Sequence, residues 1–196
     1  TNSVYRPHED PMHRYVETDP LGDATAPHSP TYGVSKVSQE AVARTMARVL
    51  DLPTTIARIN ASYGPNGGLP AYHGDWVAAG EPVWLRDPGP NAYSPIHEDD
   101  MARQVEALLE AASAPATIVN WCGDDVVTAE EWVALYGAHL GVAPKLARYE
   151  LPGGQPGSAG DPTRRLSLTG PCTVDWRDGM VATLNARIDS RDSTGN

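Results

Sequence analysis

The chain has 196 residues, enough to bury the core of one ordinary domain or a small two-lobed one, and 15 lysines and arginines stand against 25 aspartates and glutamates. The formal net charge of -10 argues against a surface that attracts nucleic acid phosphates, so we expect no nucleic acid partner. Because the chain shows no membrane-length apolar run, no secretory leader and only two cysteines, we expect a soluble cytoplasmic protein with no membrane partner.

The first part of the chain is predicted to contain the end of a strand, a long loop, a helix and a strand. Residues 1–5 are β-branched and aromatic, and residues 6–30 carry five prolines and form the loop. A loop longer than about 12–15 residues is often functional, so this loop is a candidate part of a site. Apolar residues at helical spacing predict a helix over residues 33–50, and the β-branched run at residues 54–60 predicts a strand.

The rest of the chain continues this alternation. The expected elements are helices at residues 71–79, 98–112 and 175–188, strands at residues 82–86, 117–121 and 145–151, and a frayed tail at residues 189–196. Thr128 and Glu131 fit a capping box, from which helical spacing runs on to Gly141. Strands that alternate with helices are typical of an α/β fold with a parallel sheet and crossover helices.

Two segments resemble binding sites only superficially. Residues 154–160 match the spacing G-x-x-G-x-x-G, but Pro156 stands at the centre and no apolar helix follows, so we expect a flexible connector rather than a phosphate loop. His8 and His13 lie in one polar loop without the helical spacing of metal ligands, so we expect no metal site there.

Tyr32 and Lys36 form the pair with the clearest chemical meaning. Their spacing places a phenol and an ammonium on one face of the predicted helix, one turn apart. Because a nearby cation favours the phenolate, such a pair can exchange a proton with a substrate hydroxyl. Taken alone, the spacing favours a packed tyrosine beside a solvated lysine, and the neighbouring motifs change that reading.

Six motifs in chain order resemble those of the extended short-chain dehydrogenase/reductases, the NAD-dependent epimerase/dehydratase group. They are Thr1-Asn2-Ser3-Val4-Tyr5, Glu17-Thr18-Asp19-Pro20, Tyr32 to Lys36 followed by Glu40, Ala57-Arg58-Ile59-Asn60 with Tyr63-Gly64-Pro65, Ile96-His97-Glu98-Asp99-Asp100, and Trp176-Arg177-Asp178-Gly179-Met180. No single motif is specific, but their order along nearly the whole chain is a strong signal.

The resemblance implies a mechanism and the residues that carry it. Tyr32 would move a proton on or off a substrate hydroxyl while hydride passes between that carbon and the nicotinamide of NAD or NADP. Lys36 would favour the phenolate of Tyr32 and hold the nicotinamide ribose, and Thr1 would hydrogen-bond the same substrate oxygen. Asn60 would lie near the nicotinamide and the substrate. The resemblance also implies a homodimer in which the helix of Tyr32 packs against its copy.

Three departures from the family pattern bear on cofactor and substrate. The family's glycine-rich turn should precede residue 1, so we expect a longer native protein or a partner segment that supplies the first strands. Asn2 and Ser3 stand where the dehydratases of the family carry Asp-Glu, which disfavours dehydration. Tyr93 replaces the arginine that clamps the diphosphate in nucleotide-sugar enzymes, so a less anionic substrate becomes a serious competitor. Tyr93 and the nearby cation Arg86 are expected, with Thr1 and Asn60, to bind the substrate.

We therefore expect an α/β fold: part of a doubly wound Rossmann-type parallel sheet with a small C-terminal substrate-binding lobe. Residues 1–64 and 98–122 would form the NAD(P)-binding part, and residues 65–97 and 123–196 the lobe. The predicted function is NAD(P)-dependent epimerisation or oxidoreduction at a hydroxyl or carbonyl carbon of a sugar or related small molecule. The alternative is a non-catalytic NAD(P)-binding sensor or scaffold, favoured by the lost arginine and the absent glycine-rich turn.

Overall fold

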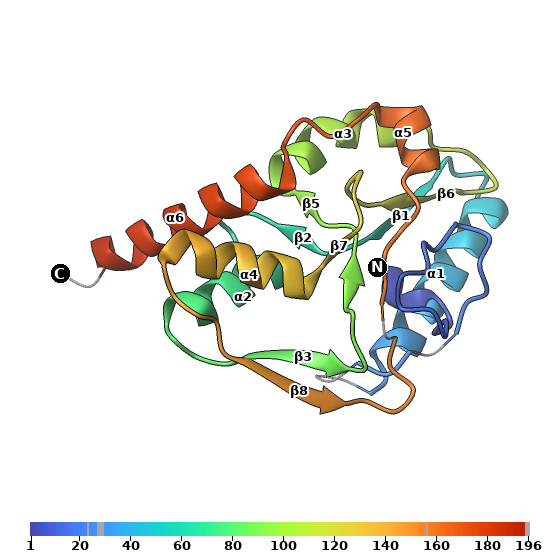
Figure 1. Ribbon diagram of the computed structural model, residues 1–196. Coiled ribbons are helices and arrows are strands. Elements are labelled where there is room, and N and C mark those ends of the chain that lie inside the picture. The colour runs from blue at the N-terminus through green and yellow to red at the C-terminus, as the bar shows by residue number, and fades with distance from the viewer. Residues whose placement is uncertain (23, 27–29, 156, 195–196) are drawn as a thin grey trace.

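The computed structural model describes residues 1–22, 24–26, 30–155 and 157–194 (Figure 1). The helices are η1 (Asn2–Val4), α1 (Tyr32–Val49), α2 (Leu69–Ala78), α3 (Glu98–Glu110), α4 (Ala129–Leu140), α5 (Thr163–Thr169) and α6 (Trp176–Thr194). The strands are β1 (Thr55–Ile59), β2 (Ser62–Tyr63), β3 (Val83–Asp87), β4 (Ala92–Tyr93), β5 (Ile96–His97), β6 (Thr117–Trp121), β7 (Val127–Thr128) and β8 (Leu146–Glu150). No helix in these described ranges is long and apolar enough to cross a membrane.

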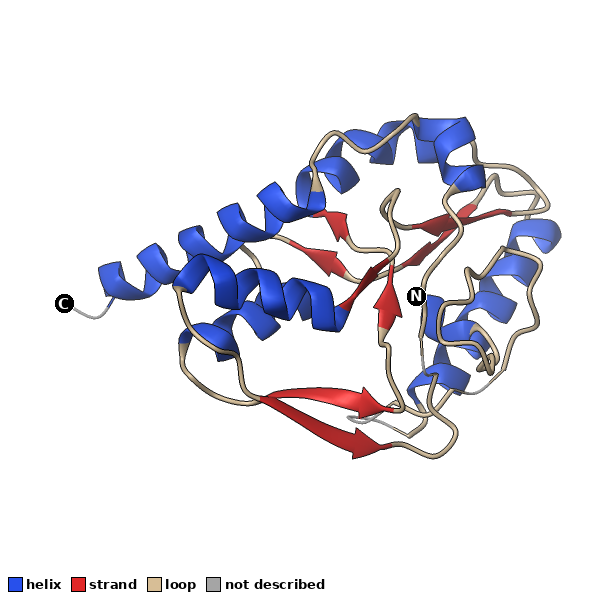
Figure 2. Cartoon of the chain, viewed as in Figure 1, coloured by secondary structure: helices blue, strands red, loops and turns tan. Residues whose placement is uncertain are grey.

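The strands pair in four small sheets, three of them parallel. β1 lies parallel to β6, with Thr55 opposite Thr117, and β3 lies parallel to β8. The short strands β2 and β5 pair in parallel, whereas β4 and β7 pair antiparallel. Figure 2 shows that the β3–β8 ribbon lies apart from the β1–β6 pair. Parallel pairs that are joined through helices confirm the α/β class expected from the alternation.

The largest core lies between α2, α4, α6 and strand β3. Its buried residues include Val77, Val83, Leu85, Trp132, Val133, Tyr136, Met180 and Leu184. A second, smaller cluster joins Val4 and Tyr5 to Tyr15 from the long N-terminal loop, where the two tyrosine rings stack at 4.7 Å. The long loop is thus packed at its middle. The division of the chain into two parts, as drawn from the motifs, stays a prediction.

Two expectations about local structure were wrong, and one helix was not predicted. Residues 1–5 are not the end of a strand, because the Thr1 hydroxyl accepts from the Ser3 amide and starts the 3-10 turn η1. The tail does not fray at residue 189, because Arg187 and Arg191 both bind Asp75 of α2 and α6 therefore continues to Thr194. Helix α5 was not expected at all.

The glycine-rich segment is the third wrong expectation, since most of it is not a flexible connector. Gly157 and Gly160 are buried, and the Ser158 amide donates to the Ala92 carbonyl at 2.8 Å. Tyr15 pairs with this segment through the Ala159 carbonyl at 2.9 Å. Pro156 lies outside the described residues. The segment is held by the long loop on one side and by β4 on the other.

The capping box at the start of α4 gives a first testable prediction. The Thr128 hydroxyl accepts from the Glu131 amide at 3.2 Å, and the Glu131 carboxylate accepts from the Thr128 amide at 2.8 Å. We expect Thr128→Ala to lower the free energy of unfolding by about 1 kcal/mol, since it leaves an amide of the first turn unpaired. Urea denaturation measures this, with the exposed Thr45→Ala on α1 as a control for loss of a hydroxyl; equal costs would contradict the capping role.

Candidate functional site

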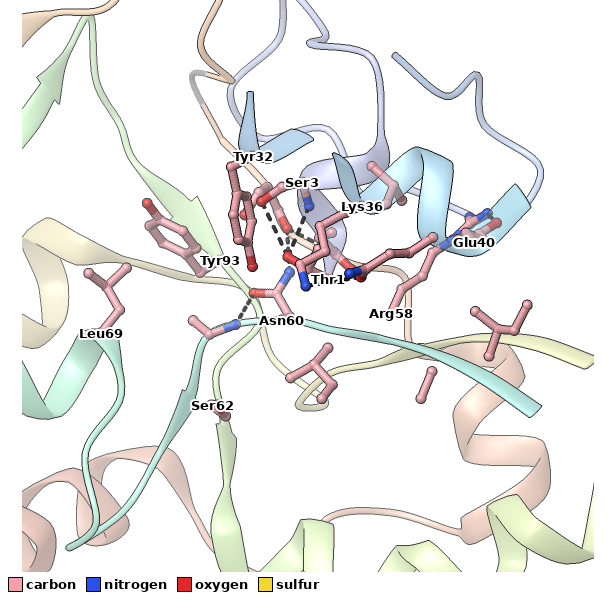
Figure 3. A pocket seen from close by; sticks show the side chains of 18 of the residues that line it. Thr1, Ser3, Tyr32, Lys36, Glu40, Arg58, Asn60, Ser62, Leu69 and Tyr93 are labelled. Atoms are coloured by element: carbon pink, nitrogen blue, oxygen red, sulfur yellow. Dashed lines mark hydrogen bonds and ion pairs between the residues drawn. The ribbon is translucent and has the colours of Figure 1, made fainter. Parts of the chain in front are cut away.

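A cavity of about 630 Å³ collects most of the residues that the motifs single out. Thr1, Tyr32, Lys36, Asn60 and Tyr93 all line it, and we call it the main cavity. Figure 3 shows Tyr32 between Tyr93 and Thr1, with Asn60 beneath it. Thr1 caps η1, Tyr32 and Lys36 lie at the start of α1, Asn60 directly follows β1, and Tyr93 belongs to β4. The carboxyl end of a strand in a parallel sheet is where ligands of α/β folds bind.

Tyr32 and Lys36 are placed by the first turn of α1. The Lys36 ammonium lies 5.5 Å from the centre of the Tyr32 ring and donates to Gln39 Oε1 at 3.1 Å. Gly33 lets the long loop press on this turn, because a Cβ there would lie 2.6 Å from the Ala24 carbonyl oxygen. The spacing therefore does bring the phenol and the ammonium to one face of α1, as the sequence predicts.

Asn60 lines the main cavity but uses most of its amide to hold neighbouring backbone. Its oxygen accepts from the amides of Ala61 at 2.8 Å and Ser94 at 3.1 Å, and its nitrogen donates to the Ser158 carbonyl. Asn2 donates to the same carbonyl at 3.0 Å. Asn60 thus joins three segments of the cavity wall, including the glycine-rich segment that sequence reasoning left out of the site.

A buried ion pair supports this wall from behind. Arg58 is 1% exposed and Glu40 is 6% exposed, and they form a bidentate pair with distances of 2.9 Å and 2.6 Å. Arg58 also donates to the Tyr5 hydroxyl at 2.8 Å, which in turn donates to Asn120 Oδ1 at 2.6 Å. Such planar, two-point pairing fixes orientation as well as charge. The pair locks α1 to β1, and with them Lys36 to Asn60.

Arg86, assigned from the sequence to substrate binding, does not line the main cavity. It lines a second hollow of about 250 Å³, which we call the side chamber. The two hollows share Ser3, Leu69, Tyr93 and Ser158, so they meet beside Tyr93. Arg86 therefore lines a hollow that adjoins the main cavity, and its assignment to substrate binding stays a prediction.

His73 of α2 lines the side chamber and is a residue that sequence reasoning missed. It is 3% exposed, its Nδ1 accepts from Trp132 Nε1 at 3.0 Å, and its ring stacks with Trp76 at 5.4 Å between centroids. Burial lowers the pKa of His73 to about 4, so the imidazole is neutral at pH 7. The sequence around His73 gives no sign that its imidazole is buried and lines a hollow, because the helix that carries it is of mixed polarity.

The buried imidazole gives a pH prediction. His73 has a pKa near 6.5 in the unfolded chain and about 4 in the folded one, so the unfolded state binds a proton first as the pH falls. The free energy of unfolding therefore decreases as the pH drops from about 6.5 to about 4. Between about pH 7 and pH 5 the loss from this one group is about 2 kcal/mol. We expect His73→Gln to lack this component in urea denaturation at both pH values. An equal loss in wild type and variant would show that His73 does not titrate this way.

The family comparison can now be set against this geometry. A family model described as "NAD dependent epimerase/dehydratase family" matches residues 1–122. The chain belongs to this family. The resemblance read from the six motifs is thereby confirmed, and the matched residues include Thr1, Tyr32, Lys36 and Asn60. Dependence on a nicotinamide cofactor, expected from the sequence, is likewise confirmed for the family, with NAD named.

Solved structures agree on the fold. The chain matches the dTDP-glucose 4,6-dehydratase DesIV from Streptomyces venezuelae, with NAD and TYD bound (22% identity, TM-score 0.78, 98% of this chain and 59% of that one). It also matches the UDP-glucuronic acid 4-epimerase from Bacillus cereus in complex with UDP-glucuronic acid and NAD (20%, TM-score 0.80, 97% and 60%). A third match is the UDP-glucose 4-epimerase of Thermus thermophilus in complex with NAD (21%, TM-score 0.76, 94% and 60%).

The chain spans about 60% of the length of these structures, which supports the partial Rossmann-type sheet expected from the motifs. A search of curated protein sequences finds no match. At these identities the likeness establishes the fold, whereas chemistry has to be argued from the residues of this chain.

Proposed function

We propose that this protein is an NAD-dependent epimerase or oxidoreductase that acts on a hydroxyl or carbonyl carbon of a sugar or related small molecule. The observation that carries the proposal is the convergence of Tyr32, Lys36 and Asn60 on one cavity, in a chain of an NAD-dependent family. The residues fit a nicotinamide riboside, because the cavity offers an ammonium donor, an amide and a phenol around 630 Å³ of space.

In the proposed mechanism, bound NAD would supply the hydride acceptor and donor. Tyr32 accepts the proton of the substrate hydroxyl as the C–H bond of the carbon that bears this hydroxyl breaks. Tyr32 returns a proton to the oxygen when the carbonyl is reduced. Lys36, 5.5 Å from the Tyr32 ring, places its positive charge beside the phenol and offers its N–H donors to the ribose. Thr1 supplies a hydroxyl to the substrate oxygen, and Asn60 keeps the surrounding backbone in place.

Dehydration fits the main cavity less well than epimerisation or oxidoreduction. Elimination needs a carboxylate as acid or base near the reacting carbon. Among the described residues that line the main cavity, Glu40 is the one carboxylate, and both of its oxygens are bound by Arg58. Asn2 and Ser3 stand at the positions of the family's Asp-Glu pair and supply no carboxylate. This argument favours an enzyme that transfers hydride without eliminating water.

One experiment separates the candidate functions. The full-length protein is titrated with NADH by fluorescence and then mixed with NAD and a panel of sugars and hydroxy acids. Product stereochemistry is followed by NMR and cofactor reduction by absorbance. Net NADH indicates an oxidoreductase, and a new epimer without net NADH indicates an epimerase. Tight NADH binding with no turnover over the panel would overturn the proposal in favour of a sensor.

We also propose a homodimer in the cytoplasm. Helix α1 exposes the apolar side chains of Val42 (62% exposed) and Val49 (70% exposed). A dimer interface would remove this apolar surface from water. We expect a dimer in analytical ultracentrifugation and its dissociation in Val42→Glu, whereas a monomeric wild type would contradict the proposal. The free thiols of Cys122 and Cys172 are consistent with a reducing compartment.

A further inference from the structure

The side chamber carries polar groups for which the proposed hydride chemistry has no use. Arg86 and His73 line it, and neither lines the main cavity. Trp84, Tyr93 and Tyr149 add aromatic walls. Because the chamber meets the main cavity beside Tyr93, one small molecule can reach from the phenol of Tyr32 into the chamber.

Among the described residues, Arg86 has no anionic partner: its Nη1 is buried without a hydrogen bond to any of them, and none of their carboxylates lies within ion-pair distance. The acidic side chain of Glu130 on α4 is paired with Arg148 at 3.0 Å instead. Asn91 binds both the amide and the carbonyl of Arg86, at 2.7 Å and 2.9 Å, which fixes the backbone beneath the guanidinium. An anionic ligand would give this buried, unpaired donor the hydrogen-bond partner it lacks, while Asn91 holds the backbone of Arg86 in place.

Two neutral donors accompany this cation. The indole nitrogen of Trp132 can only donate, so His73 Nδ1 accepts and the proton of the neutral ring sits on Nε2. The second donor is Tyr93: burial raises the pKa of its phenol, with Arg86 opposing the rise, so the phenol keeps its proton at pH 7. Arg86 therefore supplies a positive charge to the lining of the chamber, and His73 and Tyr93 supply neutral donors beside it.

We propose that the side chamber binds a carboxylate of the substrate through Arg86, Tyr93 and His73, so that the substrate is a hydroxy acid or sugar acid. The inference deepens the proposed function and rests on it for the place of the reacting carbon. One guanidinium matches one planar carboxylate in charge and geometry. A nucleoside diphosphate brings more charge and bulk than one cation and about 250 Å³ accommodate, since whole-ligand pockets run from about 300 to 1,000 Å³.

The test compares acids with their neutral counterparts by isothermal titration calorimetry on the full-length protein with NAD present. The probes are glucuronate and galacturonate, glucose and galactose, and UDP. We expect each acid to bind at least about 10-fold more tightly than its neutral sugar. Arg86→Met should weaken acid binding by about 10- to 100-fold and leave the neutral sugars unchanged. Arg86→Lys should fall between, because it keeps the charge and loses the planar fork.

Three results would overturn the inference. They are unchanged acid binding in Arg86→Met, tighter binding of UDP than of either acid, and no binding of either acid. If Arg86→Met does not fold by circular dichroism, Tyr93→Phe takes its place, with a few-fold loss expected for the acids alone. Tyr32→Phe is expected to keep the preference for acids, so failure of the hydride chemistry and failure of the side chamber are told apart.

Discussion

Tyr32→Phe is expected to lower kcat/KM for the NAD-linked reaction by about 100- to 10,000-fold, the usual contribution of a positioned acid–base group. The variant keeps the ring that lies between Tyr93 and Thr1 and removes only the hydroxyl that exchanges the proton. NADH binding, followed by fluorescence titration, should stay within about 3-fold of wild type, because binding does not need that proton.

Two comparisons make this result specific. Tyr72→Phe removes the same group from a tyrosine that is 48% exposed and lines neither hollow, and should leave turnover unchanged. Lys36→Met should lower turnover and also weaken NADH binding, since Lys36 is proposed to serve both the phenol and the ribose. Full activity in Tyr32→Phe would remove the basis of the proposed function.

Glu40→Ala is expected to destabilise the fold by about 3–5 kcal/mol in urea denaturation, because it leaves the buried Arg58 guanidinium without its partner. Glu40→Ala should also disturb the main cavity, because the Glu40–Arg58 pair holds α1 against β1. Replacing both charges, as Glu40→Leu with Arg58→Met, should cost less than Glu40→Ala alone, because no buried charge is then left unpaired.

Arg44 supplies the matched control on the same helix. It lies 3.6 Å from Glu40 Oε1, but its side chain is 40% exposed, so Arg44→Ala should cost no more than about 1 kcal/mol. The interpretation fails if Glu40→Ala costs as little as Arg44→Ala.

Several parts of the molecule were accessible from sequence because they depend on neighbours along the chain. Helical spacing predicts α1 within one residue at each end, and the capping box predicts the start of α4. Acidic residues in the expected first turn predict the start of the helix at residue 98, where His97 accepts from the Asp99 amide at 3.2 Å. The four-residue step from Tyr32 to Lys36 is likewise a property of any helix.

Other parts were inaccessible because distant residues decide them. The Ser158 carbonyl joins the site through Asn60, a residue 98 positions earlier, and nothing in a glycine-rich segment signals that contact. The length of α6 depends on the ion pairs of Arg187 and Arg191 with Asp75. The helix propensity of residues 189–194 gives no information about these ion pairs. In both cases a long-range hydrogen bond or ion pair outweighs a weak local preference.

The sequence by itself therefore determined the α/β class, the family and the pairing of Tyr32 with Lys36, since short spacings and local propensities encode them. Only the tertiary structure decided which residues share a hollow. It brought Thr1, Tyr32 and Asn60 together, and it set Arg86 apart with His73 in a chamber of its own. The physical reason is that buried polar groups find their partners among residues far apart in the sequence. Residue spacing, in contrast, reports only on neighbours along the chain.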